Sequence, residues 1–133
     1  MITNDPKAYV KDYRTDNLRA AEENRAKWFL YLYKEGKDSG LSSEFAAEAM
    51  RESGKFMAKD VFKGVNTPET FGDTIMDEVH VKAYEGTAVS EDGQTKLCFA
   101  YCPMVNAWSK LVPESELPEL CAICEEMYKA CCE

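Results

Sequence analysis

The chain has 133 residues, a length that suits one domain with a single core. Its composition, 45% hydrophobic and 30% charged residues, is that of a folded globular protein and excludes a disordered chain. The formal net charge of -8 repels a nucleic acid backbone or an anionic membrane, so we expect neither as a partner. The first residues lack the apolar stretch of an export signal, which predicts a cytoplasmic protein.

The predicted elements begin after a polar segment. Residues 1–17 show no sustained period and are expected to form a flexible or short lead-in segment, followed by a single α+β domain over 18–133. Good helix formers dominate the next stretch, where residues recur at spacings of three and four: Ala21, Arg25, Trp28 and Leu32, with Phe29 and Tyr33 beside them. This pattern predicts an amphipathic helix that ends near Gly36.

Two more helices are predicted before any strand. Ser42 or Ser43 can cap a second helix that runs to about Lys63 and packs antiparallel to the first. Thr67 and Pro68 form the cap and first position of a short third helix, because proline fits the first helical turn.

The spacing of the apolar residues then changes to every second residue, as in a β-strand. Val79 and Val81 alternate with His80, and a second alternating run follows at 97–101, with the turn residues Glu91-Asp92-Gly93 between the runs. The pattern predicts a β-hairpin at about 78–101, so the fold class is α+β, with helices packed on a small antiparallel sheet and placed before and after it. Because one hairpin is too little sheet to stand alone, it is expected to lie on helices or to pair with further strand.

Helical spacing returns after the hairpin. Pro103 suits the first position of a helix, and a final helix is predicted from about Glu116 to Cys132. All six cysteines lie between Cys98 and Cys132, so disulfides could not connect them to the first two thirds of the chain. Free thiols or a metal site remain as interpretations.

Cys102 has a physical reason to be reactive. It directly precedes Pro103, where a strand is expected to meet a helix, so its sulfur would lie near the unpaired amides of a helix N-terminus. Such a setting lowers the pKa of a thiol and favours the nucleophilic thiolate. A small buried residue that only packs between strand and helix is the other interpretation, and both stay open.

The remaining candidates have simpler interpretations. Cys121, Cys124 and Cys131 share one face of the last helix, and for Cys124 and Cys131 ordinary packing is favoured. A zinc site would use Cys98, Cys102, Cys121 and Cys124, but Cys98 and Cys102 on one strand would lie about 13 Å apart, so no metal or other cofactor is predicted. His80, the one histidine, is expected on the surface.

The hairpin, the motif Tyr101-Cys102-Pro103-Met104-Val105-Asn106-Ala107-Trp108 and the later Leu120-Cys121 give the chain a resemblance to a known family. It resembles the L-2-amino-thiazoline-4-carboxylic acid hydrolase-like family over roughly residues 18 to 130. The resemblance implies a hydrolase of carbon–nitrogen bonds in small cyclic amidine-like substrates. It also implies that Cys102 and Cys121 are catalytic, with Tyr101, Asn106 and Trp108 lining the substrate pocket.

The chain departs from the family at its end. Family members continue past the Cys121 helix into further strands, whereas this sequence ends at Glu133. The family's C-terminal strands are therefore expected to be missing or to come from another chain, in a homo-oligomer or with a partner that completes the sheet.

Three function classes follow from these observations. The leading hypothesis is an enzyme, a hydrolase with Cys102 as nucleophile and a small-molecule substrate. The alternative is a non-catalytic small-molecule-binding or regulatory module with an apolar pocket lined by Trp108, Tyr101 and Phe99, and the resemblance implies, by fold analogy, a relation to 4-vinyl-reductase-like domains. The third is a cysteine-ligated metal-binding domain.

Overall fold

Six α-helices and one β-hairpin form the part of the chain that the computed structural model describes, residue 4 and residues 11–133. The elements are α1 (Tyr13–Asp38), α2 (Glu44–Lys59), α3 (Pro68–Ile75), α4 (Glu78–Tyr84), β1 (Gly86–Glu91), β2 (Gln94–Phe99), α5 (Pro103–Trp108), the 3-10 turn η1 (Glu114–Glu116) and α6 (Leu117–Cys131). The predicted α+β class is confirmed. Of the predicted lead-in segment, residues 1–3 and 5–10 lie outside the described residues, and α1 already begins at Tyr13.

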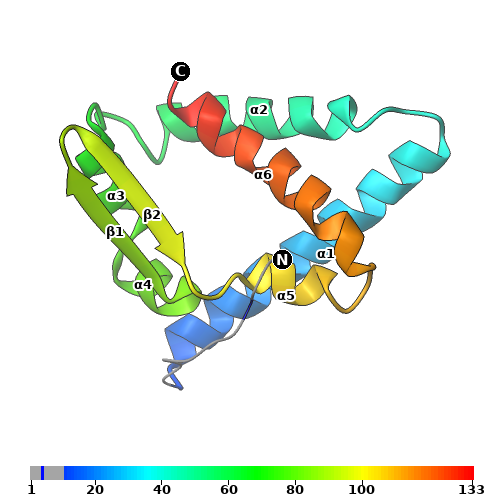
Figure 1. Cartoon of the computed structure of the whole chain (residues 1–133), viewed down its shortest axis with the longest axis horizontal. Helices are drawn as coiled ribbons and strands as arrows, with labels where there is room; N and C mark the ends of the chain where they lie inside the picture. Colours follow the sequence, from blue (N-terminus) through cyan, green and yellow to red (C-terminus); the bar gives the residue numbers. More distant parts are fainter. Residues whose placement is uncertain (1–3, 5–10) are drawn as a thin grey trace.

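The helices form a frame with the hairpin at one end. In Figure 1, α1, α2 and α6 are its three sides, α5 lies against α1, and the hairpin with α3 and α4 lies at one end. The sequence predicts α2 as the partner of α1, but α2 packs chiefly along α6. This pairing is possible because Gly54 of α2 has no side chain, so its backbone directly meets the Met127 carbonyl of α6.

The core lies where α1, α2, α5 and α6 meet. Ala26 and Leu30 of α1 are completely buried, and Trp108 of α5 and Leu120 of α6 are each 1% exposed. The Trp108 ring nitrogen Nε1 donates a hydrogen bond of 2.8 Å to the Ala26 carbonyl, so this buried indole keeps its polar group paired. Trp108 is therefore a core residue that ties α5 to α1.

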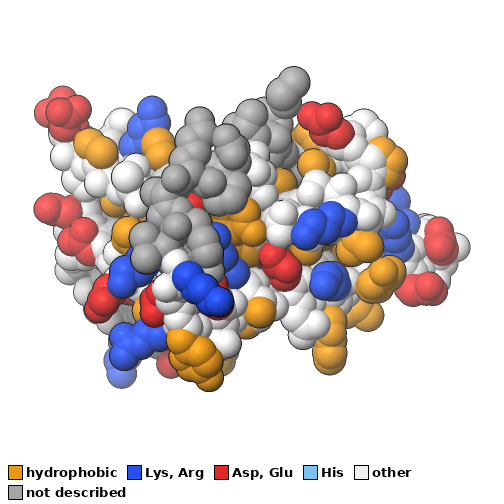
Figure 2. Space-filling view, turned by 90° about the horizontal axis from the view of Figure 1, so that it is seen from below, with side chains coloured by type: hydrophobic (Ala, Val, Ile, Leu, Met, Phe, Trp, Pro, Cys, Tyr) orange, Lys and Arg blue, Asp and Glu red, His pale blue; other side chains and the backbone are white. Residues whose placement is uncertain are grey.

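The buried face of α1 is not the one that the spacing of its large residues indicates. Trp28 and Leu32 belong to the predicted apolar strip, yet they are 69% and 68% exposed. Glu22, Ala26 and Leu30 form the buried side instead. On the side of the molecule where α1 lies, hydrophobic side chains are interspersed with acidic and basic ones (Figure 2). The helix thus carries apolar residues on two opposite sides.

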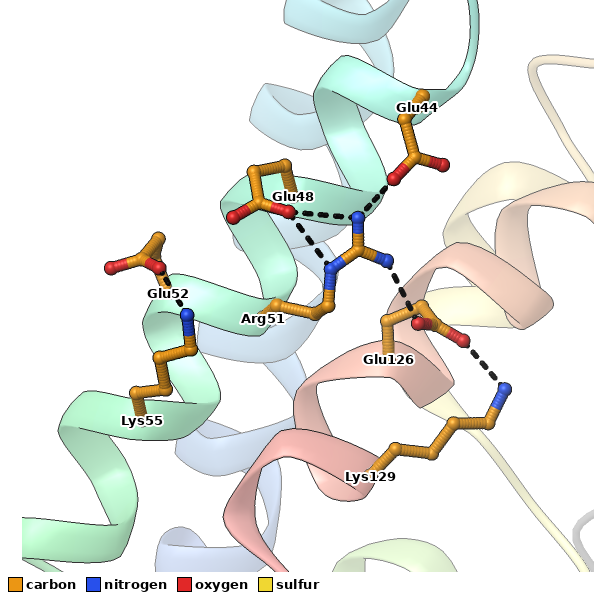
Figure 3. A network of polar contacts seen from close by, with 7 residues as sticks. All are labelled: Glu44, Glu48, Arg51, Glu52, Lys55, Glu126 and Lys129. Carbon is orange, nitrogen blue, oxygen red and sulfur yellow. Dashed lines mark hydrogen bonds and ion pairs between the residues drawn. The ribbon is translucent and has the colours of Figure 1, made fainter. Parts of the chain in front are cut away.

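A network of charges joins α2 to α6 beside the Gly54 contact. Arg51 of α2 pairs with Glu44 and Glu48 on its own helix and with Glu126 of α6, whose carboxylate lies 3.0 Å from Arg51 Nη1 (Figure 3). These carboxylates raise the pKa of Arg51 above its ordinary value, so the guanidinium stays charged. One cation therefore serves three carboxylates across the helix pair.

The first predicted strand is wrong, because residues 78–84 form helix α4. The Asp77 side chain accepts hydrogen bonds from the backbone amides of Val79 and His80, at 2.9 and 2.8 Å, which caps a helix start. Glu85 then ends the helix in the left-handed conformation, with φ of 46°. This local capping overrides the alternation of valines that suggests a strand.

A hairpin is nevertheless present inside the predicted range of about 78–101. Its strands pair antiparallel from Gly86 with Phe99 to Glu91 with Gln94. Asp92 and Gly93 form the connecting turn, and both have positive φ, as the tight turn of a right-twisted hairpin requires. The hairpin rests on α3, and its open end brings Phe99 beside Tyr84 of α4, with ring centroids 5.5 Å apart.

Candidate functional site

A cavity of about 330 Å³ lies among α1, α2, α4 and α6, next to the open end of the hairpin. Its wall is largely apolar and includes every methionine of the described residues: Met50, Met57, Met76, Met104 and Met127. Methionine is unbranched and has a polarisable sulfur, so a wall of this kind can adapt to the shape of an apolar guest. The volume falls within the range of pockets that hold small organic molecules.

Methionines reach this wall from three helices and from the residue that follows a fourth. Met50 and Met57 lie seven residues apart on one side of α2, and Met127 faces them from α6. Met104 comes from α5, and Met76 follows directly after the end of α3. The spacing of Met50 and Met57 is visible in the sequence, but only the packing of the helices brings the other three to the same place.

One side of the cavity is polar. Glu22 of α1 is only 4% exposed, and its carboxylate accepts a hydrogen bond of 2.6 Å from the Arg25 guanidinium. Burial, and then the negative charge of Glu22, raise the pKa of Tyr84 and raise the pKa of Tyr128 to about 12. Both phenols therefore stay protonated at neutral pH and keep a hydrogen to donate.

The hydroxyls of Tyr84 and Tyr128 have no hydrogen-bond partner among the described residues. Two hydroxyls without partners among the described residues, next to the buried carboxylate of Glu22, can bind a polar group of a guest molecule.

His80 also lines the cavity, and its side chain is 40% exposed, in keeping with the predicted surface histidine, but it lies on helix α4 and not on a strand. Its Nδ1 atom lies 2.8 Å from the Asp77 carboxylate, and its ring stacks on Tyr84 with centroids 6.2 Å apart. Burial alone would raise the pKa of Asp77, but hydrogen bonds from the backbone and ring of His80 lower it below its ordinary value. The ionised Asp77 therefore caps α4 and lies beside the imidazole.

The expected activation of Cys102 is wrong in its net effect. Cys102 does precede α5 in an extended conformation, and the amides of Val105 and Met104 lower its pKa. Burial has the larger effect, however, so the pKa of the thiol is raised. The backbone of Cys102 is also held from both sides by Asn4, whose Oδ1 accepts from the Cys102 amide at 2.6 Å.

The other cysteines of this region are neutral thiols too. Burial, with the charge of Cys102 as a second cause, raises the pKa of Cys121 to about 11. Burial raises the pKa of Cys124 to about 12. Cys124, expected to serve packing alone, lines the cavity, whereas Cys102 and Cys121 are not among the described residues that line it.

The predicted pocket residues are mostly elsewhere. Phe99 lines the cavity. Tyr101 is buried beneath the Arg19 guanidinium, 4.1 Å from the ring centre, and Asn106 donates a hydrogen bond of 2.8 Å to Glu23. Trp108 belongs to the core. The structure therefore does not bring these three residues together at the cavity.

The polar residues of the cavity were not predicted from the sequence. For Glu22, however, the sequence contains a pattern that could have indicated a buried, paired carboxylate. It lies four and eight residues before Ala26 and Leu30, on the buried side of α1. A carboxylate on an otherwise apolar helix face is uncommon unless it is paired. Such a position can therefore be recognised from sequence once the correct face is known.

A metal site and a site in a second cavity both have less support than the methionine-lined cavity. Within the described residues, no group of three or more His, Cys, Asp or Glu side chains is placed to hold a metal ion. All six cysteines, including the predicted ligand Cys98, are free. A second cavity, of about 640 Å³, lies near the end of α6, but exposed residues such as Asn66, Thr67 and Cys132 form much of its wall.

No helix in the described part of the chain is both long and apolar enough to cross a bilayer.

Comparison of the chain with protein-family models, curated proteins and solved structures finds no match in any of the three. The resemblance to the L-2-amino-thiazoline-4-carboxylic acid hydrolase-like family therefore stays a prediction.

Proposed function

We propose that this protein is a small-molecule-binding module that holds an apolar ligand in the methionine-lined cavity. The observation that carries the proposal is the convergence of all five described methionines on one space of about 330 Å³. A protein that needs only a stable core fills such a space, because each void costs stability. A cavity kept open and lined by adaptable side chains is typical of a binding site.

The polar side of the cavity indicates the form of the ligand. Glu22 and Arg25 form an ion pair there, and Tyr84 and Tyr128 supply two hydroxyl groups. A purely apolar guest would leave the two hydroxyl groups without partners, at a cost in free energy. The ligand expected is therefore a compact molecule with an apolar body and one polar group.

Hydrolysis by Cys102 stays a prediction with less support. A nucleophilic cysteine needs thiolate character and access to its substrate. Burial raises the pKa of Cys102, and Cys124 is the cysteine that lines the cavity. The binding module, the alternative function predicted from the sequence, is the one that this geometry favours.

Titration with N-phenylnaphthylamine, an uncharged fluorophore that becomes bright in apolar surroundings, tests the proposal. Wild-type protein should give saturable binding at one site. Met57→Trp fills the cavity and should weaken binding about tenfold or more, ~1.4 kcal/mol. Met57→Lys should weaken binding to a similar extent, because it places a charge in the wall of the cavity. This variant replaces Met57→Trp in the test if the tryptophan side chain disturbs folding.

The matched control is Val89→Trp. Val89 is 58% exposed on β1 and does not line the cavity, so the same new side chain should leave binding unchanged there. Circular dichroism checks that each variant is folded. Binding that is absent in the wild type, or equal in all folded variants, would overturn the proposal.

A further inference from the structure

The outer side of α1 carries a strip of large apolar side chains in solvent. Trp28, Tyr31 and Leu32 are 69%, 57% and 68% exposed. Their spacings of three and four place them side by side along the helix, opposite the buried residues Ala26 and Leu30. Single exposed apolar residues are common on proteins, but a contiguous group that contains two aromatic rings marks an interaction surface.

Charged residues flank this strip symmetrically. Arg25 lies three residues before Trp28, and Glu35 lies three residues after Leu32. A two-fold axis midway between Trp28 and Leu32 would set Trp28 of one copy against Leu32 of a second copy. The same axis sets Arg25 of one copy against Glu35 of the other.

Both charges are suited to such a contact. The Arg25 side chain is 61% exposed although one of its nitrogens donates to Glu22, and a guanidinium has five N–H groups to share. Glu35 is exposed, and among the described residues no cation lies within ion-pair distance of its carboxylate. The helix therefore offers an opposite charge at each end of its apolar strip.

We infer that this face of α1 is a self-association surface, on which two copies of the chain pair with their α1 helices antiparallel. A symmetric dimer uses the same patch twice, so the patch must complement itself, as the order Arg25, Trp28, Leu32, Glu35 does in the antiparallel direction. This inference goes beyond ligand binding, since the strip lies on the side of α1 opposite its buried face.

The size of the apolar strip determines the expected affinity of the dimer. Each aromatic side chain can bury up to about 150–250 Å², so three large residues from each copy and their charged neighbours remove on the order of 1,000 Å² from solvent. This area lies at the low end of specific interfaces. The dimer should therefore be reversible, with a Kd on the order of 10 µM.

Sedimentation velocity of the full chain between roughly 1 and 200 µM tests the inference. The wild type should shift from monomer to dimer over this range. Leu32→Asp should remain monomeric, because it places a charge in the centre of the strip. Glu35→Arg should weaken the dimer at least tenfold, since Arg25 of one copy then faces an arginine of the other.

Two controls separate the proposed contact from general charge effects. Glu91→Arg makes the same change in net charge at an exposed residue of the hairpin and should leave the dimer intact. The double variant Arg25→Glu with Glu35→Arg exchanges the two charges and should restore dimerisation. A monomeric wild type, or a Leu32→Asp variant that dimerises as well as the wild type, would overturn the inference.

Discussion

At the scale of single residues, Cys102 shows how burial and a helix N-terminus compete. The amides that begin α5 stabilise a thiolate, but loss of solvent destabilises it more, and the pKa of the thiol is raised. The position of Cys102 before Pro103 can be read from the sequence. Its burial cannot, because it depends on α6 and the rest of the core packing around it.

Alkylation rates should reveal this difference. Iodoacetamide near neutral pH should modify the exposed Cys98 much faster than Cys102, because a thiol with a raised pKa contributes little thiolate. Peptide mapping by mass spectrometry at several times measures both rates in one sample. If Cys102 reacts as fast as Cys98 or faster, the thiol is activated and the hydrolase hypothesis gains support.

At the scale of the elements, most helices could be predicted from local signals. Thr67 caps α3 through a reciprocal pair of hydrogen bonds with Thr70, and Pro103 opens α5, both as expected from the sequence. The prediction failed at 78–84, where alternating valines indicate a strand. The Asp77 cap is also a local signal, and its competition with the valine pattern is decided by the fold as a whole.

The contact between α2 and α6 gives a prediction about glycine. A Cβ atom at Gly54 would collide with the Met127 carbonyl of α6, which belongs to a rigid helix backbone. A Cβ at Gly36 would meet the end of the Phe45 ring, which can turn away. Gly54→Ala should therefore lower the free energy of unfolding by about 2 kcal/mol or more, and Gly36→Ala by clearly less.

Urea unfolding followed by circular dichroism measures both variants. The comparison is matched because each changes a helical glycine to alanine, a residue with the better helix propensity. Equal or larger destabilisation by Gly36→Ala would mean that α2 and α6 do not approach as closely as described.

At the scale of the whole molecule, the candidate site arises from residues that are distant in sequence. Glu22, Met57, Met104 and Met127 come from four helices, and none belongs to a recognisable motif. Sequence patterns give the elements and their apolar residues, but not which face of α1 is buried or that α2 pairs with α6. Only Phe99 could therefore be assigned correctly to the cavity beforehand.

The raised pKa values of Cys121, Cys124 and Tyr128 predict an alkaline limit to stability. The pKa of Cys121 is raised to about 11, and those of Cys124 and Tyr128 to about 12, from ordinary values of 9.0 and 10.0. A group with a raised pKa in the folded state favours folding below its unfolded pKa. That contribution is lost as the pH rises from about 9 to about 12.

The urea midpoint should therefore fall between about pH 8 and about pH 10.5. Cys124→Ala removes one of the titrating groups, so the midpoint of this variant should fall less steeply over the same range. A midpoint that is constant or rises with pH would show that these groups are not buried as described.

The most direct test of the binding site observes the methionines themselves. Carbon-13 labelling of the methionine and alanine methyl groups gives NMR signals that include one for each of the five methionines that line the cavity: Met50, Met57, Met76, Met104 and Met127. Titration with N-phenylnaphthylamine should shift all five signals together along one binding curve, while the methyl signal of the exposed Ala122 stays in place. Signals that do not move, or that move independently of one another, would contradict a common binding cavity.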